Sequence, residues 1–178
     1  MSSLYSEIRD TIRTGDLISW RAGKVNSIFT FILYLYQKIL KPKSVHVGIV
    51  VNDIGGRVLI VEARPPCVRI FPLSLMEDFD LIRTNIPYEQ NNIDLLLEKV
   101  GYPYKALDVA KGLFYLDDDK NALYCSEIAD IYYKAIKYLP EGYYDAGRTP
   151  DQLVEAIIEV SGNKPIHVKI DRGNLHAI

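Results

Sequence analysis

The sequence predicts an α+β protein in which an antiparallel sheet packs against helices. The first half of the chain contains short runs of β-branched and aromatic residues separated by turn-forming residues, a pattern typical of antiparallel strands. The second half carries apolar residues at the spacing of amphipathic helices. A chain of 178 residues that is 48% apolar can bury one core, and we expect a single domain over residues 1–178.

The expected elements begin with a short helix that is capped by Ser2 or Ser3 and ends at Ile12. A strand follows over residues 16–20. Strands over residues 44–51 and 57–63 should form a hairpin, because the Asn-Asp-Ile-Gly-Gly sequence between them favours a turn. Two more strands, over residues 67–71 and 79–84, follow Pro65-Pro66 and complete the expected sheet.

Residues 25–40 are markedly apolar and predict a helix of about four turns that ends at the Lys-Pro-Lys sequence of residues 41–43. The segment is shorter than the ~20 apolar residues that a bilayer span needs. A mostly buried helix is one reading, and peripheral membrane or acyl-chain contact through Ile28 to Leu40 is the other. The basic residues at its end suit a lipid headgroup, but they also suit any helix C-terminus.

The second half of the chain predicts three helices and a last strand. Residues 91–100 and 125–139 carry apolar side chains on one helical face. Thr149 followed by Pro150 is a typical helix start, with a capping hydroxyl and a proline at the first helical position. Residues 166–170 alternate as a strand would.

Composition excludes several function classes. A net charge of −2 and a pI near 5.9 provide no basic face for nucleic acid. The polar N-terminus does not resemble a secretory signal, so we expect a cytoplasmic protein, with peripheral membrane contact as an alternative. Its two cysteines are expected to be free thiols, and its three histidines form no zinc-site spacing, so we expect neither a metal nor another cofactor.

Cys125 is the first candidate for chemistry, because it stands where a polar loop gives way to a helical pattern. Amides and the dipole of a helix N-terminus stabilise a thiolate, which is the reactive form of cysteine. A small buried cysteine with no chemical role is the alternative. Cys67 follows two prolines on an expected strand, with no helix terminus behind it, and is expected to be inert.

His46 and Glu62 are the candidate partners of Cys125. His46 lies in Ser-Val-His-Val-Gly-Ile-Val, where alternation puts it on one face with Ser44 and Gly48. Glu62 lies in the apolar run of the paired strand, where a carboxylate is costly unless it is paired. If the hairpin brings the two together, Glu62 can accept the imidazole N–H and orient the ring, and the alternative is a solvent-facing glutamate.

Five short motifs occur in one order along the chain: Thr-Gly-Asp-Leu-Ile (14–18), Val-His-Val-Gly-Ile-Val (45–50), Val-Glu-Ala (61–63), Gly-Tyr-Pro-Tyr (101–104) and Tyr-Cys-Ser-Glu (124–127). Together they resemble the YiiX-like branch of the NlpC-type papain-fold superfamily. The resemblance implies a circularly permuted papain-like fold, in which the histidine strand precedes the cysteine helix. It further implies a thiol nucleophile, with relatives that include peptidoglycan-type amidases and the lecithin retinol acyltransferase group. The third site residue varies in identity across the superfamily, so the role of Glu62 depends on the hairpin argument as well.

These observations predict a cysteine hydrolase or acyltransferase acting on an amide or ester, with Cys125 as nucleophile, His46 as base and Glu62 as orienting group. The expected substrate is a small molecule, a peptide, a cell-wall amide or an acyl-lipid. One rival is a non-enzymatic lipid or acyl-chain binding module, and another is an interaction domain that dimerises through the apolar helix. Near the C-terminus, His167 and His176 are weaker candidates than His46.

Overall fold

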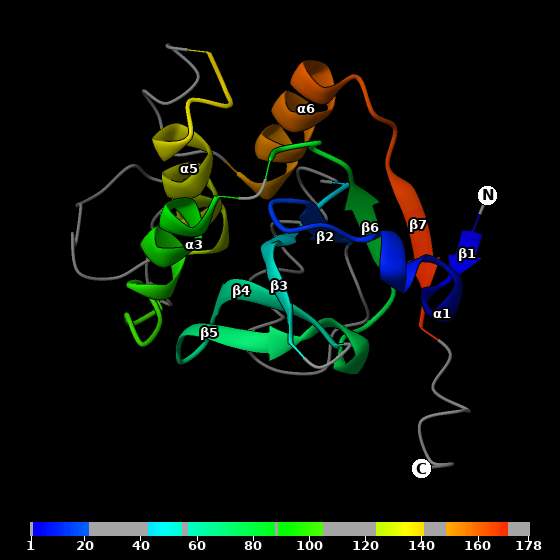
Figure 1. Ribbon diagram of the computed structural model, residues 1–178, viewed down its shortest axis with the longest axis horizontal. Coiled ribbons are helices and arrows are strands. Elements are labelled where there is room, and N and C mark those ends of the chain that lie inside the picture. Colours follow the sequence, from blue (N-terminus) through cyan, green and yellow to red (C-terminus); the bar gives the residue numbers. More distant parts are fainter. Residues whose placement is uncertain are drawn as a thin grey trace.

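A seven-stranded sheet forms the centre of the computed structural model, which describes residues 2–21, 43–54, 57–87, 89–104, 124–140 and 149–170. The strand order is β1-β7-β6-β2-β3-β4-β5 (Figure 1). The six strands from β7 to β5 pair antiparallel, and β1 adds to β7 in parallel at one edge. The strands are β1 (Ser2–Leu4), β2 (Leu17–Trp20), β3 (His46–Ile54), β4 (Arg57–Arg64), β5 (Cys67–Pro72), β6 (Phe79–Ile82) and β7 (Ile166–Lys169).

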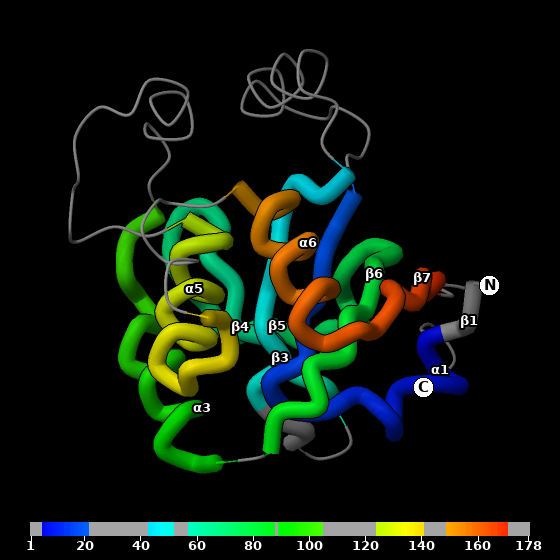
Figure 2. The backbone as a smooth tube through the Cα atoms, turned by 90° about the horizontal axis from the view of Figure 1, so that it is seen from above, coloured from blue at the N-terminus to red at the C-terminus, as the bar shows by residue number. Residues whose placement is uncertain are grey.

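The described helices pack on this sheet in two groups (Figures 1 and 2). Helix α5 (Cys125–Ala135) lies against β3 and β4, and α3 (Gln90–Leu97) lies beside α5. Helix α6 (Pro150–Ser161) packs on β2 and β6. A short helix α1 (Tyr5–Ile8) and the 3-10 turn Arg9–Thr11 follow β1 at the edge of the sheet, and another 3-10 turn, Leu73–Leu75, follows β5.

Apolar side chains fill both faces of the sheet. Alternation along β3 sends Val47 and Ile49 toward α5, where they join the buried helix residues Ile128 and Tyr132. Val50 lies on the opposite face, in a second cluster. That second cluster also contains Ile18, Ile60, Leu73, Phe79 and Leu81. The period-two pattern of the sequence thus corresponds to two buried faces.

The α+β class, the antiparallel sheet and the hairpin of β3 and β4 are confirmed. The N-terminal helix is wrong at its start: Ser2 and Ser3 do not cap it but lie in β1, paired with His167 and Val168 of β7. Pairing with a strand from the far end of the chain replaces the local capping that the sequence favoured.

Helix α5 also ends earlier than expected. The apolar pattern runs on to Leu139, which is buried, but the helix stops at Ala135. Lys137 adopts a left-handed backbone with φ 53°, and the Tyr138 N–H bonds the Tyr133 carbonyl at 2.9 Å. The chain therefore turns at this point while Leu139 still reaches the core.

The apolar segment over residues 25–40, with its stretch from Ile28 to Leu40, lies outside the described residues, and so does His176. In the described part of the chain, the helices lack the length and apolarity that crossing a bilayer requires.

Candidate active site

Cys125 is the first residue of α5, as the sequence predicts. Tyr124 before it is extended, with φ −109° and ψ 171°, and its N–H donates to a carboxylate oxygen of Glu127 at 3.0 Å. This bond closes the first turn of the helix. Cys125 is 5% exposed. Because Cys125 opens the helix, its sulfur lies at a helix N-terminus, where free amides and the helix dipole favour a negative charge.

His46 is the first residue of β3, and neighbouring elements fix its backbone. It pairs with Trp20 across the β2–β3 ladder, and the Val45 N–H bonds the Trp20 carbonyl at 2.9 Å. The Trp20 ring lies against the imidazole, with centroids 5.1 Å apart and planes inclined by 36°. The indole Nε1 of Trp20 is buried and has no hydrogen-bond partner among the described residues.

The residues that lead into His46 are tied to α6. The Ser44 N–H donates to Oδ1 of Asp151, in the first turn of α6, at 3.1 Å. The Ser44 hydroxyl accepts a hydrogen bond from Ser19 at 2.9 Å. Ser44 was expected on the strand, on the same face as His46. It instead precedes β3 and bonds a side chain of β2, because the strand begins two residues later.

Glu62 lies on β4 and is fully buried, so the solvent-facing alternative is wrong. Its Oε2 is 2.6 Å from Nε2 of His46. Its Oε1 accepts two bonds from Arg69 on β5, from Nε at 2.8 Å and from Nη2 at 2.6 Å. Each oxygen of the buried carboxylate therefore has a charged or chargeable partner, which is the condition for burying such a group.

The electrostatics of the cluster favour a protonated imidazole. Burial alone would lower the pKa of His46, but the charge and hydrogen bond of Cys125, followed by those of Glu62, raise that pKa to about 9. For Glu62, burial opposes ionisation, yet His46 and then Arg69 hold its pKa below the ordinary value. Because Glu62 occupies Nε2, Nδ1 is the ring nitrogen left for the thiol of Cys125.

The structure thus brings Cys125, His46 and Glu62 into one cluster. The other thiol and the other described imidazole lie elsewhere. Cys67 opens β5 and pairs with Pro103 of the chain after α3. On β7, Nδ1 of His167 lies 2.9 Å from Oδ1 of Asp80, and two strands, β6 and β2, separate β7 from β3.

Sequence reasoning missed two members of this neighbourhood. Arg69 pairs directly with Glu62 across the β4–β5 ladder, and a tight turn at Pro65-Pro66 is the signal that could have placed it there. Tyr104 is the second missed residue, because the sequence indicates it only as the last residue of the Gly-Tyr-Pro-Tyr motif (101–104). Burial, and after it the charge of Cys125, raises the pKa of its phenol, which places the ring within electrostatic reach of the thiol. Its backbone N–H bonds the Pro66 carbonyl at 2.9 Å, fixing it beside the start of β5.

A cavity of about 430 Å³ lies at the other end of α5, and residues that line it include Ile136, Asn85, Glu89 and Asn92. None of the three clustered residues lines it. Across the described ranges, no group of three or more histidine, cysteine, aspartate or glutamate side chains has an arrangement that could hold a metal ion.

No protein-family model matches the chain, and no curated protein matches its sequence. The functional assignment therefore depends on the geometry of Cys125, His46 and Glu62.

Proposed function

We propose that the protein is a cysteine hydrolase or acyltransferase that acts on an amide or ester bond. Cys125 is the nucleophile, His46 is its base, and Glu62 orients the imidazole. The observation that carries this proposal is the position of His46, which interacts with a thiol at a helix N-terminus on one side and with a fully buried carboxylate on the other. A thiol is activated when a base contacts it and an orienting group holds that base from the other side.

The reaction begins with transfer of the Cys125 proton to Nδ1 of His46. The thiolate attacks the substrate carbonyl carbon, and the carbonyl oxygen takes the negative charge of the tetrahedral intermediate. His46 then gives its proton to the leaving amine or alcohol, and a thioester remains on Cys125. Water, or an acceptor amine or alcohol, loses a proton to His46 as it attacks the thioester, and the thiolate leaves.

Each protein group has a physical reason for its role. The backbone N–H of Cys125 is free of helical partners at this position and is a candidate donor to the oxyanion. Glu62 fixes the tautomer by accepting the Nε2–H and stabilises the imidazolium that forms beside the thiolate. The raised pKa of His46, about 9, means that the imidazolium produced by the proton transfer from Cys125 is the favoured form at neutral pH.

The finer fold assignment is part of this proposal. We infer a circularly permuted papain-like arrangement of the NlpC type. Its support is the chain order, in which the strand that carries His46 and the strand that carries Glu62 both precede the helix that Cys125 opens. The antiparallel sheet with α5 packed on β3 and β4 agrees with this arrangement.

The amino-acid sequence supports a preference among the possible substrate classes. Peptides, acyl-lipids and cell-wall amides all present the carbonyl that this chemistry needs. The apolar segment between Ile28 and Leu40 favours an acyl-lipid, at a membrane surface that the protein contacts peripherally. Turnover of muropeptides without any turnover of acyl-lipids would contradict this preference.

The first test is the rate at which iodoacetamide alkylates Cys125 from about pH 4 to about pH 9, read by mass spectrometry of each cysteine peptide. Cys67 serves as the internal control, since it is a free thiol of the same chain with no helix terminus behind it. We expect fast labelling of Cys125 well below the free-thiol pKa of about 8.5, and slower labelling in His46→Ala.

Labelling of Cys125 that is no faster than that of Cys67, and indifferent to His46, would overturn the enzyme proposal. The non-enzymatic lipid or acyl-chain binding module would then take its place. Retained binding of an acyl-lipid vesicle by the Cys125→Ala variant, together with no turnover by wild type, would be its signature.

A further inference from the structure

The contacts of the candidate site continue past Glu62 to a fourth side chain. Arg69 of β5 stands directly opposite Glu62 of β4 in the ladder, and both of its bonds go to Oε1. Oε2 instead bonds Nε2 of His46. The four side chains therefore form a line across three adjacent strands and onto helix α5, with Arg69 at one end and Cys125 at the other.

The division of the carboxylate oxygens fixes the Glu62 side chain. A carboxylate with only His46 as partner could rotate about its last bond and present either oxygen. The guanidinium takes one oxygen through two nitrogens, which holds that oxygen in place and favours the charged carboxylate, while His46 holds the other oxygen. Glu62 is fully buried, whereas the Arg69 side chain is 33% exposed, so the arginine supplies its charge from the rim without being fully desolvated.

Arg69 is itself held in place. Its guanidinium carbon lies 4.4 Å from the centroid of the Phe71 ring, two residues along the same face of β5. An arginine that stacks on a ring and binds a carboxylate at the same time has few alternative rotamers.

We propose that Arg69 is a positioning residue that keeps Glu62 ionised and aligned with Nε2 of His46, and that it thereby sets the range of pH over which His46 is protonated. The inference deepens the proposed function and rests on it for its catalytic meaning. Arg69 acts on the imidazole only through Glu62.

The direction in which the pKa of His46 changes on removal of Arg69 distinguishes this role from that of a nearby cation that acts on the imidazole directly. By Coulomb's law alone, removing a cation near His46 would raise the pKa of the imidazole. Releasing Glu62 has the opposite effect, because a buried carboxylate without its guanidinium loses charge or alignment, and the imidazolium loses its stabilising partner. The proposal therefore predicts that the pKa of His46 falls when Arg69 is neutralised.

Other charged groups around His46 lie on the neighbouring elements. Cys125 contributes from α5 and Glu62 from β4, and the phenol of Tyr104 interacts electrostatically with Cys125. Arg64, the last residue of β4, acts on Tyr104. Trp20 of β2 carries no charge. Arg69 is therefore the described cation that bonds a partner of His46 directly.

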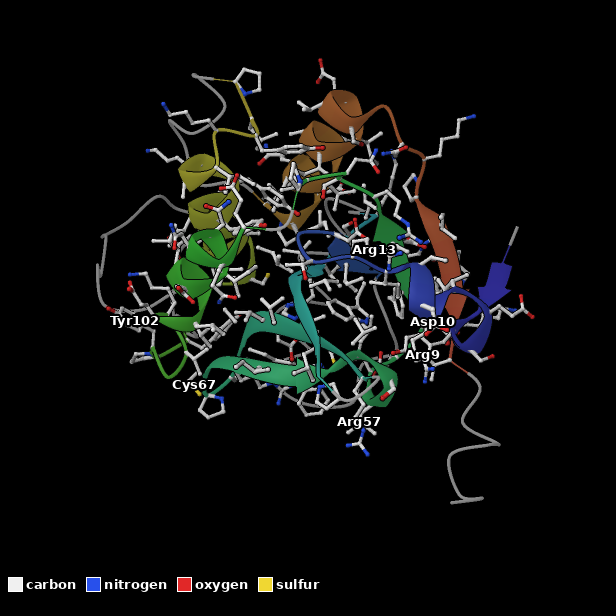
Figure 3. All side chains as sticks on the ribbon, in the orientation of Figure 1. Arg9, Asp10, Arg13, Arg57, Cys67 and Tyr102 are labelled. Carbon is white, nitrogen blue, oxygen red and sulfur yellow. The ribbon has the colours of Figure 1, made fainter. Side chains whose placement is uncertain are left out.

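The test is an NMR titration of the His46 imidazole in the full chain with isotope-labelled histidine, using wild type, Arg69→Gln and Arg69→Lys. We expect the pKa of His46 to fall by about one unit or more in Arg69→Gln, and to recover most of that loss in Arg69→Lys. Arg57→Gln is the matched control, because it makes the same change at the end of β4 remote from Glu62, where the side chain projects into solvent (Figure 3). It should leave the titration unchanged.

An unchanged or raised pKa in Arg69→Gln would overturn the proposal. If Arg69→Gln does not fold, the double variant Glu62→Gln/Arg69→Gln decides. Recovery of folding would mean that Arg69 serves the buried carboxylate, whereas continued failure would mean that it serves packing alone and would overturn the proposal. The titration needs no substrate, so it can succeed even if Cys125 alkylation shows that the enzyme proposal is wrong.

Discussion

Gly48 explains how Glu62 can reach His46 across the β3–β4 ladder. A Cβ at Gly48 would lie 3.5 Å from Cβ of Glu62 and 3.3 Å from the Val61 carbonyl oxygen. The absence of a side chain between His46 and Val50 on this face leaves room for the glutamate to extend toward the start of β3. Close approach, and not an unusual backbone angle, is the reason for glycine here.

The first prediction follows from this contact. Gly48→Ala should change the free energy of unfolding by less than about 1 kcal/mol, because the crowding of the ladder and the lost flexibility of glycine in the unfolded chain oppose each other. The alkylation of Cys125 should nevertheless slow, because the new methyl group crowds the Val61 carbonyl oxygen at 3.3 Å and shifts the β4 backbone that carries Glu62. Urea unfolding and the iodoacetamide assay give the two values, and a wild-type alkylation rate would show that Gly48 has no bearing on the site.

Glu62 itself is expected to matter for both stability and chemistry. Glu62→Gln keeps the size of the side chain but leaves Arg69 without its anion in a buried contact. Removing one partner of such a pair costs about 3–5 kcal/mol, and Arg69 at the rim should place the loss at the lower end. Urea unfolding at neutral pH measures it.

Glu155→Gln provides the matched control for that change. Glu155 is an exposed residue of α6 that faces Lys43 at 3.6 Å, with both side chains largely in solvent. Exposed pairs of this kind contribute at most about 1 kcal/mol. Equal losses of stability in the two variants would contradict the special role given to the buried carboxylate.

At the scale of elements, α6 sets the approach of the chain to His46. Thr149 caps the helix by accepting from the Gln152 N–H, and Pro150 follows at the first helical position. The same first turn contributes Asp151, which holds the Ser44 N–H two residues before His46. The start of one helix therefore positions the start of the strand that carries the proposed base.

Thr149→Ala should destabilise the protein by about 1 kcal/mol, because the cap is lost while the rest of the helix remains. Thr149→Ser keeps the hydroxyl and should recover most of that loss. Thermal or urea unfolding of both variants tests this, and an alanine variant as stable as the serine variant would show that the cap contributes nothing. The cap acts on the site only through Asp151 and Ser44, so its loss should change Cys125 alkylation less than Gly48→Ala does.

The turn before β2 joins β3, β6 and α5 through one short motif. The Gly15 carbonyl accepts from the Tyr133 hydroxyl of α5 and from Thr84, and Gly15 adopts φ +89°. Asp16 is buried, and its carboxylate accepts from the backbone N–H groups of Arg13 and Thr84. Asp16, which the sequence predicts as the start of a strand, instead precedes β2, and with Gly15 it forms a structural junction.

At the scale of the whole molecule, the sequence predicts those features of the fold and of the site that depend on local residue patterns. Alternation and turn residues defined the β3–β4 hairpin, and the polar-to-periodic transition defined the helix start at Cys125. The contact between His46 and Glu62 followed from pairing two adjacent strands. Each of these needs information from only a few neighbouring residues.

Other features depend on pairings that a single sequence does not reveal. The strand at Ser2–Leu4 exists because β7, from the far end of the chain, lies beside it. The role of Arg69 depends on register, since a shift of one residue would have turned it to the other face. The reach of Tyr104 to Cys125 depends on how the chain after α3 packs against β5.

The pH dependence of stability provides a test of the whole cluster at once. The pKa of His46 is about 9 in the folded protein, compared with 6.5 for a histidine side chain without such neighbours. A raised folded-state pKa stabilises the protein fully below pH 6.5, and this contribution is lost as the pH rises through 9. A difference of this size corresponds to a stabilisation on the order of 3 kcal/mol.

Glu62 has the opposite dependence, because its folded-state pKa lies below the ordinary value of 4.5. Its contribution is present above that value and is lost as the pH falls through the lowered pKa. Between them, the two groups should give the cluster its greatest stability in the weakly acidic range, above 4.5 and below 6.5. Urea unfolding from about pH 5 to about pH 10 follows the alkaline loss.

His46→Gln is the variant that identifies the source of the alkaline loss, because glutamine keeps a polar group beside Glu62 but does not titrate. It should be less stable than wild type near pH 6, and the two stabilities should converge as the pH rises through about 9. An equally steep alkaline loss in His46→Gln would place its origin in other groups; the buried phenol of Tyr132, whose pKa burial raises from 10.0 to about 12, loses its own contribution only above about pH 10. Convergence would instead show that protonated His46, bound between Cys125 and Glu62, is a stabilising charge of the folded protein.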